Sequence, residues 1–126
     1  MNNKLVFWAI MVVACLAIVW IGTTTLGTGP KGKYDTFAKC LAEKKTTMYG
    51  AYWCSHCQSE KRNFGSSFKY VPYVECTREP EVCRAVGVTN YPTWITADGK
   101  KYEGEQGLRR LAEISGCELR EDVNQK

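Results

Sequence analysis

The longest hydrophobic run of the chain lies near its amino terminus. Residues 5–22 (LVFWAIMVVACLAIVWIG) contain no charged side chain. A helix rises about 1.5 Å per residue, so this run would span roughly 27 Å, close to the thickness of the hydrocarbon core of a bilayer. Trp8 and Trp20 lie near its two ends, where aromatic side chains are expected at the membrane interface. The pattern predicts a transmembrane anchor over residues 1–22.

A cleaved signal peptide is the main alternative for this run. No small-x-small cleavage site follows it, and the run is longer than a usual signal core. The stretch Val12-Val13-Ala14-Cys15 resembles a lipoprotein processing box, but mostly apolar residues follow Cys15. We therefore expect the anchor to be retained. Residues 23–33 are polar and rich in glycine and threonine, which predicts a flexible linker.

The rest of the chain alternates between short strand patterns and helix patterns. Strands are predicted over residues 46–53, 70–76, 93–96 and 100–103, and helices over 36–44, 81–86 and 108–115, with a further helix that carries Cys57 and ends at Phe64. Asp35 is a plausible N-cap of the first helix. Gly65 and Gly116 follow the second and last helices as terminators, and Asp98-Gly99 predicts a hairpin turn.

This order of elements predicts an α/β domain over residues 34–117. Strands that alternate with helices favour parallel pairing, and the hairpin adds an antiparallel edge to the sheet. Pro72 must lie at the start of its strand or where no ladder hydrogen bond is needed. Residues 118–126 are mostly polar and are expected to form a frayed tail.

Composition narrows the possible functions. The chain has 126 residues, enough for one small domain, and its net charge of +4 is too modest and scattered to indicate nucleic-acid binding. Seven cysteines are many for this length. Without Cys15, the soluble part holds an even number of them, which suits an oxidising compartment. We therefore expect the domain to lie on the extracytoplasmic side of a membrane.

Cys54-Ser55-His56-Cys57 is the strongest chemical motif. It follows a predicted strand and opens a predicted helix, where unpaired backbone N–H groups and the helix dipole favour a thiolate. In this setting the pKa of the first thiol is commonly lowered, and the pair can cycle between dithiol and disulfide. The same spacing also occurs in zinc sites and in purely structural disulfides, so the motif alone leaves these alternatives open.

Three segments together resemble the thioredoxin fold over about residues 34–117. They are Met48 to Cys57 (MYGAYWCSHC), Tyr73 to Cys76 (YVEC) and Tyr91 to Trp94 (YPTW). More closely, they look like the thioredoxin-like domain attached to bacterial homologues of vitamin K epoxide reductase. Here that domain would stand alone on one membrane anchor.

The resemblance implies roles for particular residues. Pro92 would follow a cis peptide bond and face the redox pair, and the backbone of Tyr91 would pair with the substrate chain beside Trp53. A trans proline in an ordinary loop is the alternative. His56 would stabilise the Cys54 thiolate and make the disulfide more oxidising, unless it is an inert surface side chain.

Four further cysteines, and two positions at which the chain differs from the family pattern, remain to be interpreted. The resemblance implies a structural disulfide between Cys76 and Cys83, with a relay role as the alternative. Cys40 and Cys117 are either a further pair or buried free thiols. The family often has proline where this chain has Ser55, and thioredoxins have a buried acid where this chain has Met48. Deprotonation of the resolving thiol would therefore need water or another group.

We therefore expect a membrane-anchored thiol–disulfide oxidoreductase in which Cys54 attacks, Cys57 resolves and exported proteins are the substrates. No cofactor and no metal are expected. Expected partners are cysteine-containing exported proteins and a quinone-linked membrane oxidoreductase of the vitamin K epoxide reductase type. A non-catalytic thioredoxin-like interaction domain braced by disulfides is the alternative. The residues leave open whether the direction is oxidation, reduction or isomerisation.

Overall fold

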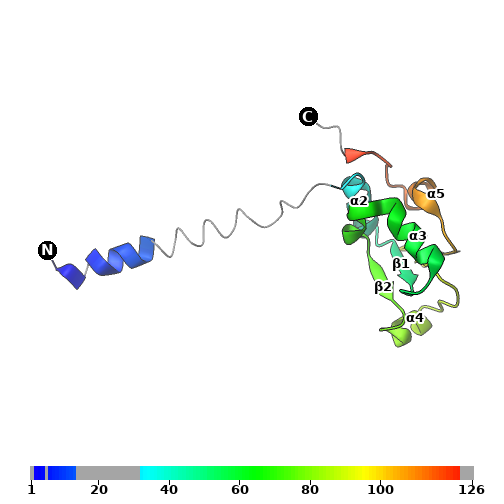
Figure 1. The fold of residues 1–126 in the computed structure, drawn as a ribbon, viewed down its shortest axis with the longest axis horizontal. Helices are drawn as coiled ribbons and strands as arrows, with labels where there is room; N and C mark the ends of the chain where they lie inside the picture. The colour runs from blue at the N-terminus through cyan, green and yellow to red at the C-terminus, as the bar shows by residue number, and fades with distance from the viewer. Residues whose placement is uncertain (1, 5, 14–31, 123–126) are drawn as a thin grey trace. The chain divides into compact units, whose positions relative to one another are not determined.

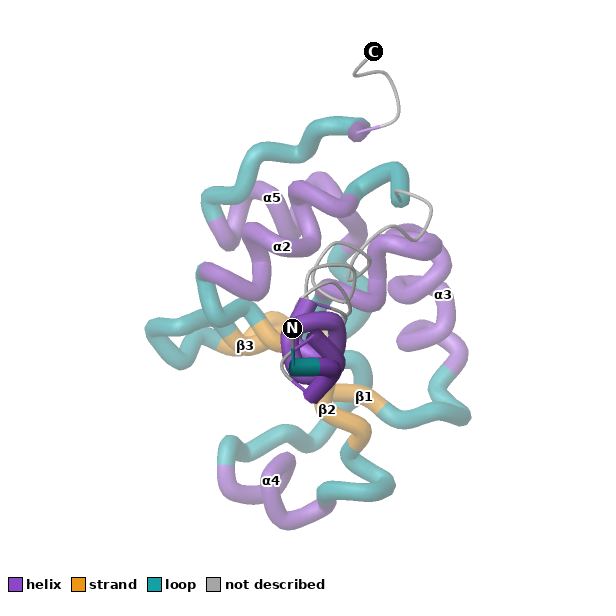
Figure 2. Tube along the Cα trace, turned by 90° about the vertical axis from the view of Figure 1, so that its left-hand side faces the viewer, coloured by secondary structure: helices purple, strands orange, loops and turns teal. Residues whose placement is uncertain are grey.

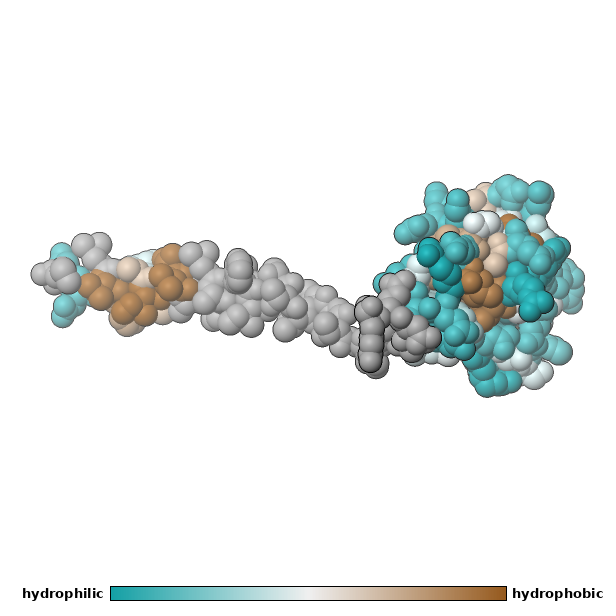
Figure 3. All heavy atoms as spheres, turned by 90° about the horizontal axis from the view of Figure 1, so that it is seen from above, coloured by the Kyte–Doolittle hydropathy of each residue, from teal (hydrophilic) through white to brown (hydrophobic). Residues whose placement is uncertain are grey.

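The computed structural model describes residues 2–4, 6–13 and 32–122. The chain forms two units, Met1–Pro30 and Lys31–Lys126. In the first unit, residues 6–13 are helical and their side chains are exposed, and Figure 3 shows them as mostly hydrophobic. No helix within these described ranges is long and apolar enough to cross a membrane. Most of the predicted anchor and linker, residues 14–31, lies outside the described residues.

The second unit alternates helices and strands in the predicted order. Its elements are α2 (Asp35–Glu43), β1 (Thr47–Gly50), α3 (Ser55–Phe64), the 3-10 helix η1 (Gly65–Tyr70), β2 (Tyr73–Glu75), α4 (Pro80–Ala85), β3 (Thr93–Ile95), β4 (Lys101–Glu103) and α5 (Gly107–Ser115). Figure 1 shows α2 and α5 toward one end of this unit and α4 at the opposite end. Figure 2 shows the same separation from the side.

The four strands form one mixed sheet in the order β2-β1-β3-β4. β1 pairs in parallel with β2 and antiparallel with β3, and β3 pairs antiparallel with β4. In the parallel register Met48 is opposite Tyr73 and Gly50 is opposite Glu75. The predicted α/β class is confirmed, and a four-stranded sheet flanked by helices is consistent with a thioredoxin-like fold.

The predicted strands are too long at two places. β1 ends at Gly50 rather than at residue 53, because the chain turns at residues 51–53 to reach the start of α3. β2 begins only at Tyr73, since Pro72 has no N–H for the ladder. The Pro72 carbonyl still accepts the Met48 N–H at 2.9 Å, so the proline lies at the strand entrance.

The 3-10 helix η1 is an element that the sequence pattern did not predict. Gly65 ends α3 with φ of +56°, as expected of a terminating glycine, but the chain continues at once into η1. Phe68 of η1 explains this continuation, because its ring packs edge-on against Phe64 and Tyr73 with centroids 6.0 and 5.7 Å apart. η1 thus closes the apolar layer between α3 and β2.

An aromatic core joins the helices to the sheet. Phe37 of α2 stacks on Phe64 of α3 at 5.9 Å, and Phe64 lies 6.3 Å from Trp94 of β3. All three rings are fully buried or nearly so. Burying a side chain of this size typically stabilises a fold by about 1.5–3 kcal/mol, so this group contributes a large share of the domain's stability.

The start of α2 differs from the prediction. Asp35 is the first helical residue rather than the N-cap, and its carboxylate accepts the Gly32 N–H at 2.9 Å. A carboxylate from the far end of the chain also serves this helix, since Asp122 accepts the Thr36 N–H at 2.7 Å. The Asp122 N–H in turn donates to the Lys33 carbonyl at 2.8 Å. The prediction of a frayed tail is therefore wrong for residues 118–122, because an acidic side chain satisfies a free amide at a helix N-terminus.

A buried carboxylate on α3 holds the start of α5. Glu60 is fully buried and accepts the backbone N–H groups of Gln106 and Gly107 at 2.7 and 2.9 Å. These N–H groups belong to the N-cap of α5 and to its first residue, where no intrahelical acceptor exists. Burial raises the pKa of Glu60, and the two backbone hydrogen bonds oppose that rise. Glu60 therefore fixes the distance and angle between α3 and α5.

Two disulfides close the unit. Cys76 joins Cys83 across a separation of 7 residues, linking the end of β2 to α4. Cys40 joins Cys117 across 77 residues, linking α2 to the segment just after α5 and its C-cap Gly116. Cys54 and Cys57 are the free cysteines among the described residues.

The two disulfides are expected to differ in their contribution to stability. In the chain-entropy model the Cys40–Cys117 loop contributes about 4.5 kcal/mol and the Cys76–Cys83 loop about 2.5 kcal/mol. Replacing Cys40 and Cys117 by alanine should therefore lower the free energy of unfolding more than replacing Cys76 and Cys83. Chemical denaturation of the full chain measures both. Equal losses, or a larger loss at Cys76 and Cys83, would contradict the expectation.

Glu60→Ala should lower the free energy of unfolding by about 2–4 kcal/mol, because two backbone N–H groups lose their acceptor. Glu113→Ala, which removes an exposed carboxylate from α5, is the matched control and should cost less than about 0.5 kcal/mol. Since the folded state raises the pKa of Glu60, the benefit of Glu60 over alanine is greatest below the unfolded pKa. It declines as the pH rises through the folded pKa. A difference that grows with rising pH would contradict this assignment.

Candidate active site

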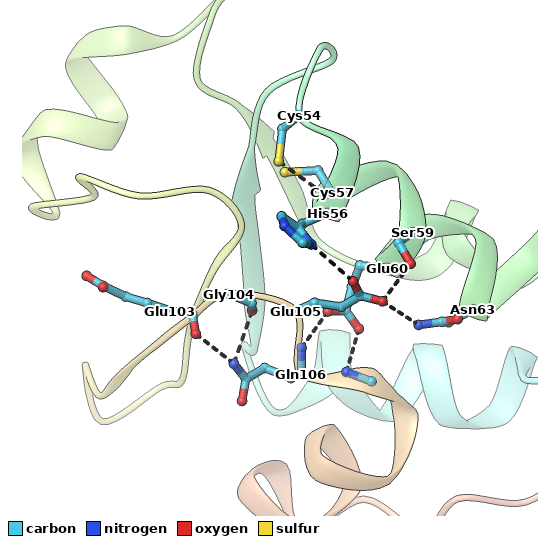
Figure 4. Close-up of polar contacts among 11 residues, drawn as sticks. Cys54, His56, Cys57, Ser59, Glu60, Asn63, Glu103, Gly104, Glu105 and Gln106 are labelled. Atoms are coloured by element: carbon cyan, nitrogen blue, oxygen red, sulfur yellow. Dashed lines mark hydrogen bonds and ion pairs between the residues drawn. The ribbon is translucent and has the colours of Figure 1, made fainter.

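Cys54 and Cys57 lie at the start of α3, as the motif predicts. Cys54 is the N-cap of α3 and has extended backbone geometry. Its sulfur accepts the Cys57 backbone N–H at 3.2 Å, which is the contact that an N-cap side chain normally makes (Figure 4). The helix N-terminus therefore directs a backbone donor at the Cys54 sulfur.

The two sulfurs of this pair have different surroundings. Cys54 is 7% exposed, whereas Cys57 is 0% exposed. Burial and the contact with Cys54 raise the pKa of Cys57 to about 12, while a hydrogen bond with the Ala51 backbone and, to a smaller extent, the Lys61 ammonium oppose the rise. A substrate can therefore reach Cys54 and not Cys57, which makes Cys54 the entry point for chemistry and Cys57 the inner thiol.

Cys54 opens onto a surface groove between two loops. One wall of this groove is the start of α3, and the other is the loop that precedes β3. The groove is lined by Trp53, Cys54, Ser55, His56, Thr89, Asn90 and Tyr91. Trp53 is 63% exposed, and its ring meets the Tyr91 ring edge-on with centroids 5.9 Å apart.

The Tyr91–Pro92 peptide bond in this second wall is cis. Pro92 is fully buried and directly precedes β3. Its carbonyl accepts the Gly104 N–H at 2.7 Å, which ties the cis bond to the end of β4. The structure thus brings Trp53, Cys54 and Tyr91 together in one groove, and it confirms the predicted cis bond before Pro92.

His56 lies beside the pair but is directed elsewhere. Its Nδ1 is 3.5 Å from Glu105 Oε2, and its side chain is 72% exposed. Figure 4 shows the imidazole pointing from α3 toward Glu105. Ser59 also donates to Glu105, at 2.6 Å, and these hydrogen bonds lower the pKa of that carboxyl against the opposing effect of its desolvation. Whether His56 stabilises the Cys54 thiolate stays a prediction.

A second polar group lies on the β2 side of Cys57. The Tyr73 hydroxyl donates to Glu75 at 2.7 Å, and the Thr77 hydroxyl donates to the same carboxylate at 2.7 Å. The Tyr52 N–H, from the turn before Cys54, donates to Glu75 at 3.1 Å. Burial opposes ionisation of Glu75, but the hydrogen bonds from Tyr73 and Thr77 prevail and lower the pKa of its carboxyl.

Sequence reasoning identified the cysteines and missed these carboxylates. The sequence patterns include Glu75 only as a member of the Tyr73 to Cys76 segment and assign no role to Glu105. Both act on α3 from segments that are distant in sequence, so no local spacing connects them with the motif. Within the described residues, no group of three or more His, Cys, Asp or Glu side chains gathers in a way that could hold a metal ion.

Comparison with known proteins finds relatives that are named for disulfide chemistry. No family model matches the chain. It is 40% identical over 91 residues to "Thiol-disulfide oxidoreductase LTO1" of Arabidopsis thaliana, covering 65% of this chain and 24% of that protein. It is 33% identical over 99 residues to "Protein disulfide isomerase-like 2-2" of Oryza sativa subsp. japonica, covering 67% and 27%. "Protein disulfide isomerase-like 2-1" of the same rice is 32% identical over 104 residues, covering 71% and 28%.

The chain spans about a quarter of the length of these curated relatives, from 24 to 28%. The similarity is therefore to one part of each relative. Together with the mixed sheet and the free Cys54–Cys57 pair at a helix start, it supports a place for this chain in the thioredoxin-like superfamily.

Proposed function

We propose that this chain is a thiol–disulfide oxidoreductase that acts through Cys54 and Cys57. The observation that carries the proposal is the asymmetry of this free pair. One sulfur lies at a helix N-terminus in an open groove, and the other is fully buried behind it. The names and sequence similarity of the relatives support the same activity.

The exchange would proceed through a mixed disulfide. The Cys54 thiolate attacks a substrate disulfide, forms a Cys54–substrate bond and releases one substrate thiolate. Cys57 then loses its proton and attacks the Cys54 sulfur, which forms the Cys54–Cys57 disulfide and releases the second substrate thiolate. The reverse sequence oxidises a substrate dithiol. In both directions the Trp53 and Tyr91 rings would contact the substrate chain, with the cis Pro92 setting the backbone position of Tyr91 and His56 tuning the thiolate.

We further propose that the domain works outside the cytoplasm on a membrane anchor formed by residues 1–22. The charge-free apolar run supports the anchor, and two disulfides in the domain support an oxidising compartment. Exported proteins with cysteines would then be the substrates. A quinone-linked membrane oxidoreductase of the vitamin K epoxide reductase type would reset the pair.

A trapping experiment tests the catalytic proposal. Cys57→Ser should accumulate mixed disulfides with other proteins, because the resolving thiol is gone while Cys54 still attacks. Cys54→Ser should accumulate few, and a Cys15→Ser background keeps that cysteine from contributing. Non-reducing gel electrophoresis after acid quenching should show at least about a tenfold excess for Cys57→Ser. Equal, low trapping by both variants would favour a non-catalytic interaction domain.

Labelling of intact cells tests the location. After mild reduction with a membrane-impermeant phosphine, an impermeant maleimide should label Cys54 before lysis as fully as after lysis. The double variant Cys15→Ser, Cys54→Ser measures how much label other thiols take up. Labelling that appears only after lysis would overturn the extracytoplasmic placement and leave the proposed chemistry intact.

A further inference from the structure

Gly50, at the end of β1, separates the buried Cys57 sulfur from a phenol. A Cβ atom added to Gly50 would lie 2.9 Å from the Cys57 sulfur, 3.2 Å from Cε2 of Tyr73 and 3.4 Å from its hydroxyl oxygen. The distance between the Cys57 sulfur and the Tyr73 hydroxyl oxygen therefore cannot exceed the sum of the first and last of these distances. Such a span is within the reach of one small side-chain movement or one bridging water molecule.

The position of this phenol in the sheet is also informative. Met48 occupies the site where thioredoxins have a buried acid, and Met48 is fully buried and nonpolar here. Its partner in the parallel register is Tyr73. Partners in a sheet project to the same face, so the polar group that β1 lacks is supplied from the neighbouring strand.

Tyr73 is held by a carboxylate and a cation. Its hydroxyl donates to Glu75 at 2.7 Å, and the Lys61 ammonium lies 3.8 Å from the centroid of its ring. Lys61 is one turn after Cys57 on α3, and its charge also acts on Cys57. A neutral hydroxyl between a buried thiol and an ionised carboxylate is an arrangement suited to passing a proton.

Resting on the proposed exchange reaction, we propose that Tyr73 and Glu75 form the proton relay of the resolving thiol Cys57. In the mixed disulfide, the Cys57 S–H proton passes to the Tyr73 oxygen while the Tyr73 proton passes to Glu75 Oε2. The sulfur electron pair released in this way forms the bond to the Cys54 sulfur. The bond between Cys54 and the substrate sulfur breaks, and the substrate leaves as a thiolate. The cysteine pair is oxidised and the substrate disulfide is reduced by the same two electrons.

The groups around Cys57 favour this route over others. Cys54 is engaged in the mixed disulfide during this step, and Lys61 is cationic and has no capacity to accept a proton. His56, on α3, is directed toward Glu105, and Tyr91 contacts Trp53 across the groove. The buried Glu60 carboxylate on α3 is occupied by the backbone of Gln106 and Gly107. Glu75 is ionised at neutral pH, because its hydrogen bonds lower the pKa of its carboxyl, and it is only partly buried, so it can return the proton to solvent.

Tyr73→Phe tests the relay by removing one oxygen atom and leaving the ring under Lys61. In a Cys15→Ser background, the reduced full chain is mixed with dithiobis(nitrobenzoate) in a stopped-flow instrument. Two colour-forming phases report the attack of Cys54 and its resolution by Cys57. At pH 7 the second phase should slow by about tenfold or more, with the first phase unchanged. Glu75→Gln should slow the same phase.

The pH profile distinguishes a relay from a structural effect. Without the relay, resolution depends on hydroxide, so its rate should rise about tenfold per pH unit from pH 6 to 9, whereas the unmodified pair should show a flatter profile. Tyr49→Phe, the same change on the neighbouring strand β1, is the control and should leave both phases unchanged. A second phase of unchanged rate in Tyr73→Phe, or one slowed equally at every pH, overturns the relay. Absence of both phases in the unmodified pair would instead overturn the proposed function.

Discussion

The burial of the Cys57 sulfur is the constraint on which the candidate site depends. Cys57 is fully inaccessible under the first turn of α3, against the end of β1. A side chain at position 50 would collide with this sulfur, which explains why a glycine ends the strand at that point. Burial also makes the two thiols unequal, because only Cys54 reaches the groove. In the proposed exchange reaction a buried thiol needs a route for its proton, and the polar groups of β2 are the ones proposed to supply it.

The position of α3 follows from two carboxylates that act in opposite directions. Glu60 projects from α3 and accepts N–H groups at the start of α5. Glu105 projects from the segment before α5 and accepts from Ser59 and faces His56 on α3 (Figure 4). One contact is buried and contributes to stability, whereas the other is largely exposed and contributes little energy but orients side chains. The buried contact of Glu60 therefore fixes α3 against α5, and the exposed contact of Glu105 orients side chains on the surface of α3.

Sequence patterns predicted the parts of this molecule that depend on local chemistry. Three such features depend only on neighbouring residues, and the structure contains all of them: the helix start at the motif, the terminating Gly65 and the hairpin at Asp98-Gly99. The patterns failed where contacts between residues distant in sequence determine the local structure. The helix η1 forms because Phe68 packs against Phe64 and Tyr73, and residues 118–122 are ordered because Asp122 serves the start of α2. The contacts of Glu75 with Tyr52 and of Glu105 with Ser59 also join residues that are distant in sequence, so local patterns do not predict them.

The inability of local patterns to predict distant contacts matters most for the reduction potential of the cysteine pair. The residues between two such cysteines are usually taken to set how strongly the disulfide oxidises, because they decide what stabilises the thiolate. In this chain the imidazole of that pair of residues faces Glu105, which lies 49 positions away in the sequence. A histidine shared between a carboxylate and a thiolate stabilises the thiolate less than one that faces it alone. On the proposed function, the Ser55-His56 dipeptide and Glu105 of the segment before α5 would therefore set the potential of the pair together.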